Sequence, residues 1–413
     1  MYNKILLLSL LILLTICIFY QKKWINYKEN YDDIDNSLKY QISSSDISPS
    51  IPSDTCKDIL CQQGQKCYNG KCVPNNFIFN EDVEYNNLTN NWTGSNFGIN
   101  KDWNFYKNTP CNNGNGCPWT NAGPLCGEKW ETRIDDSNTE ICCSEPTAGH
   151  VCYGEWNDLI SVNGNKIQIG IQEDISKSSL RNSIRLVSTQ SFNGGLFIID
   201  VQHIPEGLGT WPALWLVGKD WPNNGEIDII EGVNSSILNS PIIRNPSDQT
   251  KVITTLHTSN GCTQNIPGIM NQNCNAGDNG TIGCGIEGPS NSFGASFNNA
   301  NGGVFVCEWI LDGTIKIWFF SRLNIPDDIN SNKPSPSKWN SPYVVFQPCK
   351  GHFKDLQINI NTTLCGQWAG AVFPSINGNP GGNESCLGYL NDKNVKLDKA
   401  YWLINSIKVF QKK

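Results

Sequence analysis

The sequence predicts an all-β fold: an antiparallel two-layer sandwich or jelly roll, preceded by a small disulfide-rich module. From about residue 77 to the end, short runs of alternating apolar and polar residues recur with Gly, Asn or Pro between them. No long amphipathic helix interrupts these runs. Charged residues make up only 17% of the 413, which suits many turns between short strands better than long helices.

The amino terminus predicts export. Residues 1–20 contain a continuous apolar run of about sixteen residues, which is long for a signal-peptide core and short for a membrane span. A cleaved signal peptide and an uncleaved signal anchor therefore both remain open, and lysines on each side make a buried core helix the weaker alternative. We expect a secreted protein, or a cell-surface protein if the segment is retained. Residues 21–55 are rich in Ser and Pro and read as a flexible stalk.

The cysteines agree with an oxidising compartment. Seventeen of the eighteen follow the amino-terminal segment, which is too many for a reducing cytosol. Four of them lie in residues 56–74, a piece too small for a hydrophobic core, so two disulfides should hold it. Zinc is the rival interpretation, disfavoured because no histidine lies nearby. Cys307 stands in an alternating strand and is the residue we expect to remain a buried free thiol.

The charge of the chain excludes some partners. A formal net charge of −7 with no basic block argues against nucleic acid and against adhesion to anionic lipid, so membrane contact should occur only through the possible anchor. We expect a monomer. Potential glycosylation sites, each an Asn-x-Ser/Thr sequon, are Asn87, Asn91, Asn234, Asn279, Asn361 and Asn383.

The stretch "GEIDIIEGVN" contains the candidate catalytic residues. Glu226 and Asp228 should share one face of a strand, whereas Glu231 falls one residue out of step. A β-bulge at Ile229–Ile230 would return Glu231 to the same face. Two carboxyl groups on one face are what retaining glycoside hydrolysis needs, one as nucleophile and the other as acid and base. The simpler alternative is an ordinary strand with acidic residues facing water.

Residues 77–413 resemble glycoside hydrolase family 16, in particular its fungal-type endo-β-1,3(4)-glucanase (laminarinase) branch. The resemblance rests on "GTWPALWLVGKDWPNNGEIDIIEGVN", "TTLHTSNGC", "NTTLCGQWAG" and "YWLINSIKVFQ". It implies a concanavalin A-like jelly roll with a concave substrate cleft, and hydrolysis of internal β-1,3 or mixed-linkage glucan bonds with retention. By motif, Glu226 takes the place of the nucleophile, Asp228 that of the helper and Glu231 that of the acid/base.

The same resemblance supplies candidate substrate-binding residues. Aromatic faces are the usual stacking platforms for sugar rings. The residues matching the family's cleft lining are Trp211, Trp215, Trp221, His257, Trp368 and Arg185. Asn234 begins a sequon three residues after Glu231; because a glycan there would crowd the cleft, we expect Asn234 to be unmodified, with its side chain free to bind sugar.

Two other functions stay open at this stage: a β-glucan transglycosylase, which could use identical residues, and a non-catalytic β-glucan-binding protein. The second is disfavoured because all three carboxylates are present. No cofactor is expected to be required and no catalytic metal site is predicted. A structural Ca²⁺ occurs in relatives of the family, but no acidic loop in this sequence indicates one.

Overall fold

The computed structural model divides the chain into two compact units, residues 1–79 and 80–413. The ranges it describes are 85–106 without residue 86, 151–173, 181–235, 250–277, 282–376 and 380–411, with residue 136 and the short strands at 65–68, 71–74, 131–134 and 140–143. In the first unit, β1 (Gln65–Tyr68) and β2 (Lys71–Pro74) form an antiparallel hairpin with Cys67 opposite Cys72. The predicted signal segment, the stalk and the disulfides of the four-cysteine module lie outside the described residues.

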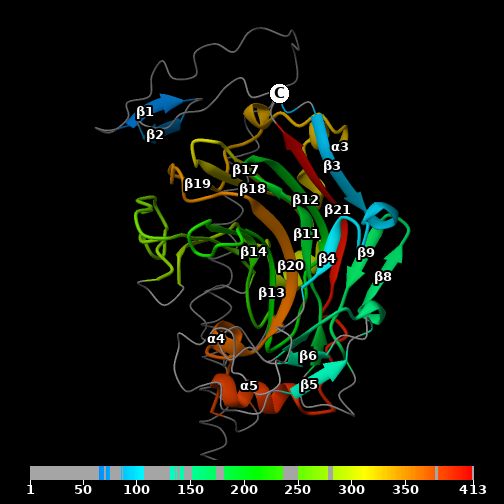
Figure 1. Ribbon diagram of the computed structural model, residues 1–413. Coiled ribbons are helices and arrows are strands. Elements are labelled where there is room, and N and C mark those ends of the chain that lie inside the picture. Colours follow the sequence, from blue (N-terminus) through cyan, green and yellow to red (C-terminus); the bar gives the residue numbers. More distant parts are fainter. Residues whose placement is uncertain are drawn as a thin grey trace, which may run out of the picture. The chain divides into compact units, whose positions relative to one another are not determined.

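Two antiparallel sheets form the second unit (Figure 1). The first has seven strands, in spatial order β16 (Cys284–Glu287), β15 (Ile253–His257), β14 (Glu226–Glu231), β13 (Thr210–Val217), β20 (Leu356–Leu364), β11 (Arg185–Phe192) and β4 (Trp103–Phe105). The second has eight, in spatial order β19 (Val344–Phe346), β18 (Ile315–Ser321), β17 (Gly303–Trp309), β12 (Gly195–His203), β21 (Trp402–Gln411), β9 (Lys166–Ile169) and β8 (Ile160–Asn163), with β3 (Asn87–Thr93) also paired to β21.

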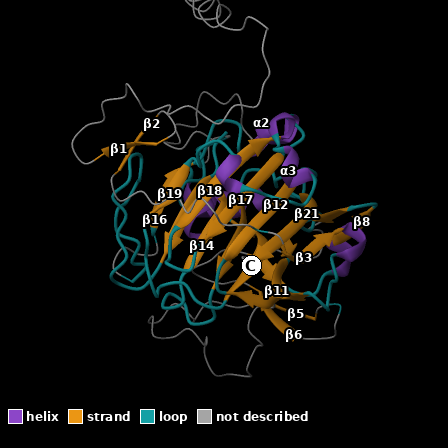
Figure 2. Cartoon of the chain, turned by 90° about the horizontal axis from the view of Figure 1, so that it is seen from above, coloured by secondary structure: helices purple, strands orange, loops and turns teal. Residues whose placement is uncertain are grey.

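Short elements connect these strands. Helices α2 (Gly294–Asn299) and α3 (Asp327–Asn330) lie at the ends of strands of the eight-stranded sheet (Figure 2). The other described elements are the parallel pair β7 (Val151–Tyr153) and β10 (Arg181–Ser183), the antiparallel pair β5 (Glu131–Ile134) and β6 (Glu140–Cys143), helices α4 (Gly366–Ala369) and α5 (Gly382–Leu390), and 3₁₀ turns at Gly94–Asn96, Asn157–Leu159, Arg322–Asn324 and Pro336–Lys338.

One apolar core lies between the sheets, because each strand turns every second side chain inward. Leu214 and Leu216 of β13 and Ile358 and Ile360 of β20 are almost completely buried in it, with Phe197 from the opposite sheet. The alternate positions face away from the core and include Trp211 and Trp215 of β13 and Asn359 and Asn361 of β20. The predicted all-β sandwich is therefore confirmed.

Among the described residues, three disulfides stabilise the loops at the strand ends, as expected of an exported protein. They join Cys262 to Cys349, Cys274 to Cys284 and Cys365 to Cys386. Cys307 is buried and unpaired, which confirms the prediction of a free thiol at this position. The cysteine cluster between residues 111 and 152 lies outside the residues whose side chains are described. Within the described residues, no helix combines the length and apolarity that crossing a membrane requires.

Candidate active site

The site is built on the side of the seven-stranded sheet that faces away from the core, and strand β13 shows which side chains belong to it. Leu214 and Leu216 point into the core, so Trp211 and Trp215 point outward, and both are half-buried. Residues directly opposite each other on neighbouring strands share a face of the sheet. We call this side, which bears Glu226, Asp228 and Glu231, the carboxylate face.

The register of β14 places all three carboxylates on the carboxylate face. Glu226 lies opposite Val217, Asp228 opposite Trp215 and Glu231 opposite Ala213, and these three positions of β13 alternate with its core leucines. With regular pairing throughout, Glu231 would fall on the opposite face, because two residues separate it from Asp228. The register shifts there against both β13 and β15, which is the bulge that the sequence predicted.

The bulge costs little because both of its residues are apolar. Ile229 and Ile230 are consecutive, yet both are fully buried and both belong to the core between the sheets. A regular strand would instead have turned one of them outward and Glu231 inward. Burial of two isoleucine side chains contributes roughly 3–6 kcal/mol, so the core itself stabilises the irregular strand.

Each outer carboxylate accepts a hydrogen bond from an indole. Trp211 donates from Nε1 to Oε1 of Glu231 at 2.7 Å. Trp221, in the turn between β13 and β14, donates to Glu226 and keeps 42% of its surface exposed. Because an indole N–H can only donate, both contacts favour the ionised form of the carboxyl group.

Asp228 lies between the outer carboxylates and is almost fully buried. Its side chain is hydrogen-bonded to Glu226, and its Oδ2 lies 3.1 Å from Nε2 of His257. The geometry of that second contact is that of a close pair and not of a hydrogen bond, because Oδ2 has no hydrogen-bond partner in the described part of the chain. His257 stands opposite Glu226 on β15. Its ring packs over Gly283, where a Cβ atom would come within 2.6 Å of Nδ1.

Burial raises the pKa of all three carboxyl groups. Burial first, and the charge of Asp228 second, raise the pKa of Glu226 to about 8. Burial raises the pKa of Glu231 to about 7, and the hydrogen bond from Trp211 opposes this rise. Burial and the charge of Glu231 raise the pKa of Asp228 well above its ordinary value. Three close carboxyl groups cannot all ionise near neutral pH, so at least one proton stays in the site.

The hydrogen bond between Glu226 and Asp228 needs one such proton. If Asp228 carries it, Glu226 is the anion that accepts hydrogen bonds from both Asp228 and Trp221. If Glu226 carries it, Glu226 is a neutral acid and cannot attack. Asp228 can therefore set the charge of Glu226 by holding the proton of the pair.

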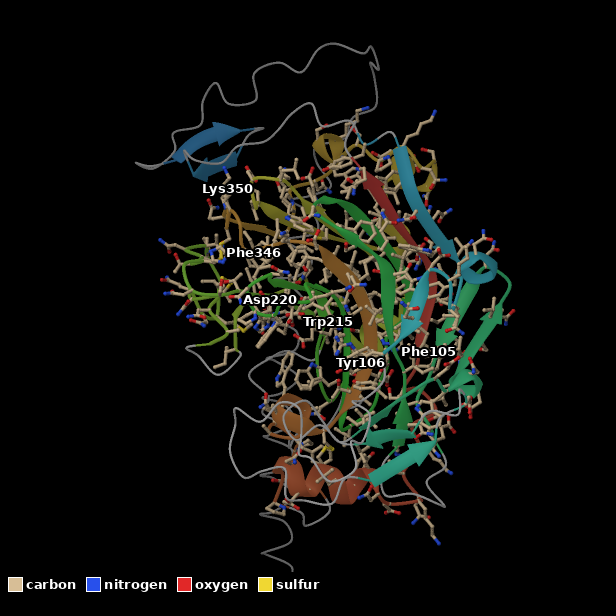
Figure 3. The ribbon with its side chains drawn as sticks, in the orientation of Figure 1. Phe105, Tyr106, Trp215, Asp220, Phe346 and Lys350 are labelled. Atoms are coloured by element: carbon tan, nitrogen blue, oxygen red, sulfur yellow. A yellow bond between two sulfur atoms is a disulfide. The ribbon has the colours of Figure 1, made fainter. Side chains whose placement is uncertain are left out.

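A second network continues the carboxylate face across β20 and β11. Trp215 donates from Nε1 to Oδ1 of Asn361 at 2.7 Å, and Arg185 donates from Nε to Oδ1 of Asn359 at 3.0 Å. The Arg185 guanidinium lies 4.7 Å from the Trp215 ring and 4.1 Å from the ring of Tyr106. Figure 3 labels Trp215 and Tyr106, the two rings that the Arg185 guanidinium contacts. Such contacts fix the orientation of the Trp215 ring.

The predicted aromatic residues gather at the two ends of β13. Trp368 of α4 is half-buried and meets the edge of the Trp211 ring, with 5.7 Å between ring centroids and 83° between planes. Trp211, Trp215, Trp221, His257 and Arg185 all border the carboxylates or their neighbours as described above. The structure thus brings six of the seven predicted binding residues to one region, and their roles in binding stay predictions.

Asn234 is the exception, and the expectation of a free side chain is wrong. Only 1% of Asn234 is exposed, its Oδ1 accepts a hydrogen bond from the Gly209 amide at 2.7 Å, and its Nδ2 donates to the Ala369 carbonyl at 2.9 Å. Both polar atoms are occupied by backbone groups because Asn234 has a positive φ of 55° and bends the chain after β14. Asn234 is a structural residue that cannot contact sugar, and the same burial leaves no room for a glycan.

Three polar residues of the carboxylate face were not predicted from the sequence: Asn359, Asn361 and Tyr106. The two asparagines alternate with buried isoleucines in "QININTTL", and this period of two marks one polar face of a strand. That signal was available. Nothing local distinguishes Tyr106, whose importance comes from its contact with Arg185 of a neighbouring strand.

Glu226, Asp228 and His257 are also the one group in the described residues whose ligand atoms, all within 4.8 Å of one another, could hold a metal ion. The donor set of two carboxylates and one imidazole would accept a divalent transition metal. A metal bound to both carboxylates would compete with the proton that the Glu226–Asp228 hydrogen bond needs. The expectation that no cofactor is required stays a prediction.

A β-sandwich with a paired-carboxylate strand on one open face has the construction of a carbohydrate-active protein. Residues 143–410 match a model described as the XgeA-like catalytic domain of glycoside hydrolase family 16. The chain belongs to glycoside hydrolase family 16.

Two relatives are similar in sequence. A probable glycosidase of Schizosaccharomyces pombe is 41% identical over 286 residues, which are 65% of this chain and 64% of that protein. An endo-1,3(4)-β-glucanase of Arthroderma benhamiae is 36% identical over 293 residues, which are 65% of this chain and 60% of that protein. The chain thus spans less than two thirds of the length of these relatives.

Two solved structures share the fold. Laminarinase 16A of Phanerochaete chrysosporium, solved with two β-glucans in its donor and acceptor sites, is 30% identical with a TM-score of 0.60 over 80% of this chain and all of that one. An elongating family 16 β-1,3-glucosyltransferase is 28% identical with a TM-score of 0.60 over 78% of this chain and 99% of that one.

Proposed function

We propose that the protein is an exported endo-β-1,3(4)-glucanase that cleaves internal β-glucan bonds with retention of configuration. The observation that carries this proposal is the bulge of β14, which sets Glu226, Asp228 and Glu231 on one face beside Trp211 and Trp221. Family membership and the endo-1,3(4)-β-glucanase relative support the same substrate class.

In the first step, the Glu226 carboxylate attacks the anomeric carbon of the bound glucan. The bond from that carbon to the glycosidic oxygen breaks, and Glu231 gives its proton to the departing oxygen. A pKa of about 7 keeps Glu231 largely protonated at mildly acidic pH, as an acid requires. For this attack the proton of the Glu226–Asp228 pair must move to Asp228, because Glu226 can attack only as the carboxylate.

In the second step, water attacks the same carbon and breaks its ester bond to Glu226. The Glu231 carboxylate takes the proton of that water and is an acid again, and Glu226 returns to a carboxylate. The Trp211 hydrogen bond stabilises Glu231 while it is charged between the two steps. No metal takes part in either step, so we expect full turnover without added cofactor.

Glucan is the substrate that the surrounding side chains fit. The aromatic rings of Trp215 and Trp221 suit the apolar faces of glucose rings. We propose β-1,3 or mixed β-1,3/1,4 linkages, a secreted or cell-surface location, and action as a monomer.

Transglycosylation is the second candidate, because a family 16 β-1,3-glucosyltransferase shares the fold over nearly its whole length. Its first step would be the same, and a sugar hydroxyl would replace water in the second. A non-catalytic β-glucan-binding protein is the third candidate.

One experiment separates the three. The protein is incubated with laminarin, lichenan, cellulose and xylan, while new reducing ends and product lengths are followed. New reducing ends from laminarin or lichenan support hydrolysis. Products longer than the starting glucan indicate transfer, and binding without products indicates a lectin.

Three variants complete that experiment. Glu226→Gln and Glu231→Gln should each lower turnover by about a thousandfold or more, since each removes one of the two reacting carboxyl groups. Glu384→Gln changes an exposed carboxyl group of α5 in the same way and should leave turnover unchanged. Full activity of either site variant would overturn the proposed mechanism.

A further inference from the structure

The bulge leaves one backbone residue outside the ladder of both neighbouring strands. Ile229 has no cross-strand partner in the register of β14 with β13 or with β15. The residue is fully buried, so its carbonyl needs a hydrogen bond from elsewhere in the protein. The shape of the bulge, and with it the direction of Glu231, depends on how that carbonyl is held.

A threonine hydroxyl supplies the missing bond. Thr254 of β15 is fully buried, and its Oγ1 donates to the Ile229 carbonyl at 3.2 Å. Its neighbours Ile253 and Thr255 lie opposite Glu231 and Asp228, so the Thr254 side chain points to the other side of the sheet, beneath the bulge. A hydroxyl buried there without a partner would be costly.

A tyrosine fixes the threonine. The hydroxyl groups of Tyr343 and Thr254 lie 2.5 Å apart. The single proton of Thr254 is used in the bond to Ile229, so Tyr343 must be the donor. Burial raises the pKa of Tyr343, which keeps that proton in place across the pH range of interest.

Tyr343 is itself anchored to the opposite sheet. Its backbone amide donates to the Ile317 carbonyl of β18 at 2.9 Å, and the next residue begins β19. The two hydroxyls therefore connect the eight-stranded sheet to the one irregular point of the candidate catalytic strand.

We infer that Thr254 and Tyr343 are positioning residues, which hold the Ile229 carbonyl so that the bulge aims Glu231 at the bond that Glu226 attacks. Neither residue touches substrate, and their kinetic effect rests on the proposed function. The pair acts on the position of Glu231, so its loss should lower kcat with little change in KM.

The test compares four variants of the full chain. Thr254→Val keeps the branched shape but removes the hydroxyl, Thr254→Ser keeps the hydroxyl, and Tyr343→Phe removes only the outer donor. Thr258→Val is the matched control: Thr258 is equally buried and donates to a backbone carbonyl, that of Ser259, away from the bulge. For each variant we measure kcat and KM on laminarin, the pH profile, and amide exchange of the peptide covering residues 226–231.

We expect Thr254→Val to lower kcat by about tenfold to a hundredfold, as misplaced reacting groups do. Tyr343→Phe should have a smaller effect in the same direction, and Thr254→Ser should restore most of kcat. The alkaline limb of the pH profile, which reports Glu231, should move in Thr254→Val and not in Thr258→Val. Amide exchange of residues 226–231 should become faster in Thr254→Val and not in Thr258→Val.

The outcomes separate this inference from the proposed function. If the wild type does not cleave glucan, the proposed function fails, and the exchange measurement still decides whether Thr254 holds the bulge. Exchange and kcat that are equal in Thr254→Val and Thr258→Val would overturn the inference while leaving the glucanase proposal intact.

Discussion

Trp211 and Glu231 are joined by a 2.7 Å hydrogen bond from the indole nitrogen to the carboxylate. The bond links Trp211, near the start of β13, to the last residue of β14. It opposes the rise in the pKa of Glu231 that burial causes. Because Glu231 is the proposed acid, the tryptophan should set the alkaline limit of activity as well as offering a ring to the substrate.

The first prediction concerns this bond. In Trp211→Phe the ring is retained but the donor is lost, so the pKa of Glu231 should rise above about 7. A hydrogen bond to a charged group is worth about 1.5–3 kcal/mol, so the alkaline limb of kcat/KM against pH should move up by about one to two units. Trp368→Phe changes the neighbouring ring, which makes no hydrogen bond to a carboxylate among the described residues, and should leave the limb where it is. An unmoved limb in Trp211→Phe would contradict this account of Glu231.

The second prediction assigns the two outer carboxylates by stereochemistry. With azide and an activated β-glucoside, Glu226→Ala should yield an α-glycosyl azide, because azide attacks in place of the missing nucleophile. Glu231→Ala should yield a β-glycosyl azide, because azide replaces water in attacking the ester at Glu226. The product is identified from the coupling constant of its anomeric proton in NMR. The opposite pair of products would exchange the two roles.

The third prediction is a change of stability with pH. A carboxyl group whose pKa is raised on folding destabilises the folded protein as it ionises, so the wild type should lose stability between about pH 4.5 and pH 8 because of Glu226. Glu226→Gln cannot ionise. We expect it to unfold at the same temperature as the wild type near pH 4 and to be more stable by about 1–3 kcal/mol at pH 8. Thermal unfolding across this range measures the difference, and Glu384→Gln is the control.

The fourth prediction concerns glycosylation of the exported protein. Asn234 and Asn361 are buried and their side chains are hydrogen-bonded, whereas Asn91 is exposed on β3. Peptide mapping should find both buried asparagines unmodified and any glycan of this group on Asn91. Full occupancy at Asn234 in an active sample would show that the loop after β14 differs from the structure.

The fifth prediction ranks two disulfides. The bond between Cys262 and Cys349 closes a loop with a sequence separation of 87, and the bond between Cys274 and Cys284 one with a separation of 10. By loop entropy the first should contribute about 4–5 kcal/mol and the second about 3 kcal/mol. Replacing both cysteines of each pair with alanine, followed by denaturant unfolding, should show the larger loss for the first pair. Equal losses would indicate that the two disulfides act mainly on the folded state and not through the loop entropy of the unfolded chain.

Much of the site was predictable because its information is local. The spacing of Glu226, Asp228 and Glu231 on one strand required a bulge. The two isoleucines between Asp228 and Glu231 can both pack in the core, which stabilises the bulge. The alternating strand around Cys307 likewise identified a buried thiol. Both predictions use only the period of a strand.

The rest depends on pairing between distant segments. The sequence predicted that the side chain of Asn234 is free beside the site. Only the positions of Gly209 and Ala369 show that both polar atoms of this side chain are hydrogen-bonded to backbone groups. The disulfide partners and the contact of Arg185 with Tyr106 are fixed in the same way, by strand order and register. A single sequence contains no local signal for either.

The bulge of β14 also bears on how this strand can change in evolution. Loss of one codon at position 229 or 230 would leave Glu-Ile-Asp-Ile-Glu, in which strict alternation alone sets the three carboxylates on one face. The bulge absorbs the extra isoleucine without changing the face that the carboxylates share. A single in-frame indel at this point can therefore lengthen or shorten the strand between Asp228 and Glu231 while the carboxylates keep their common face.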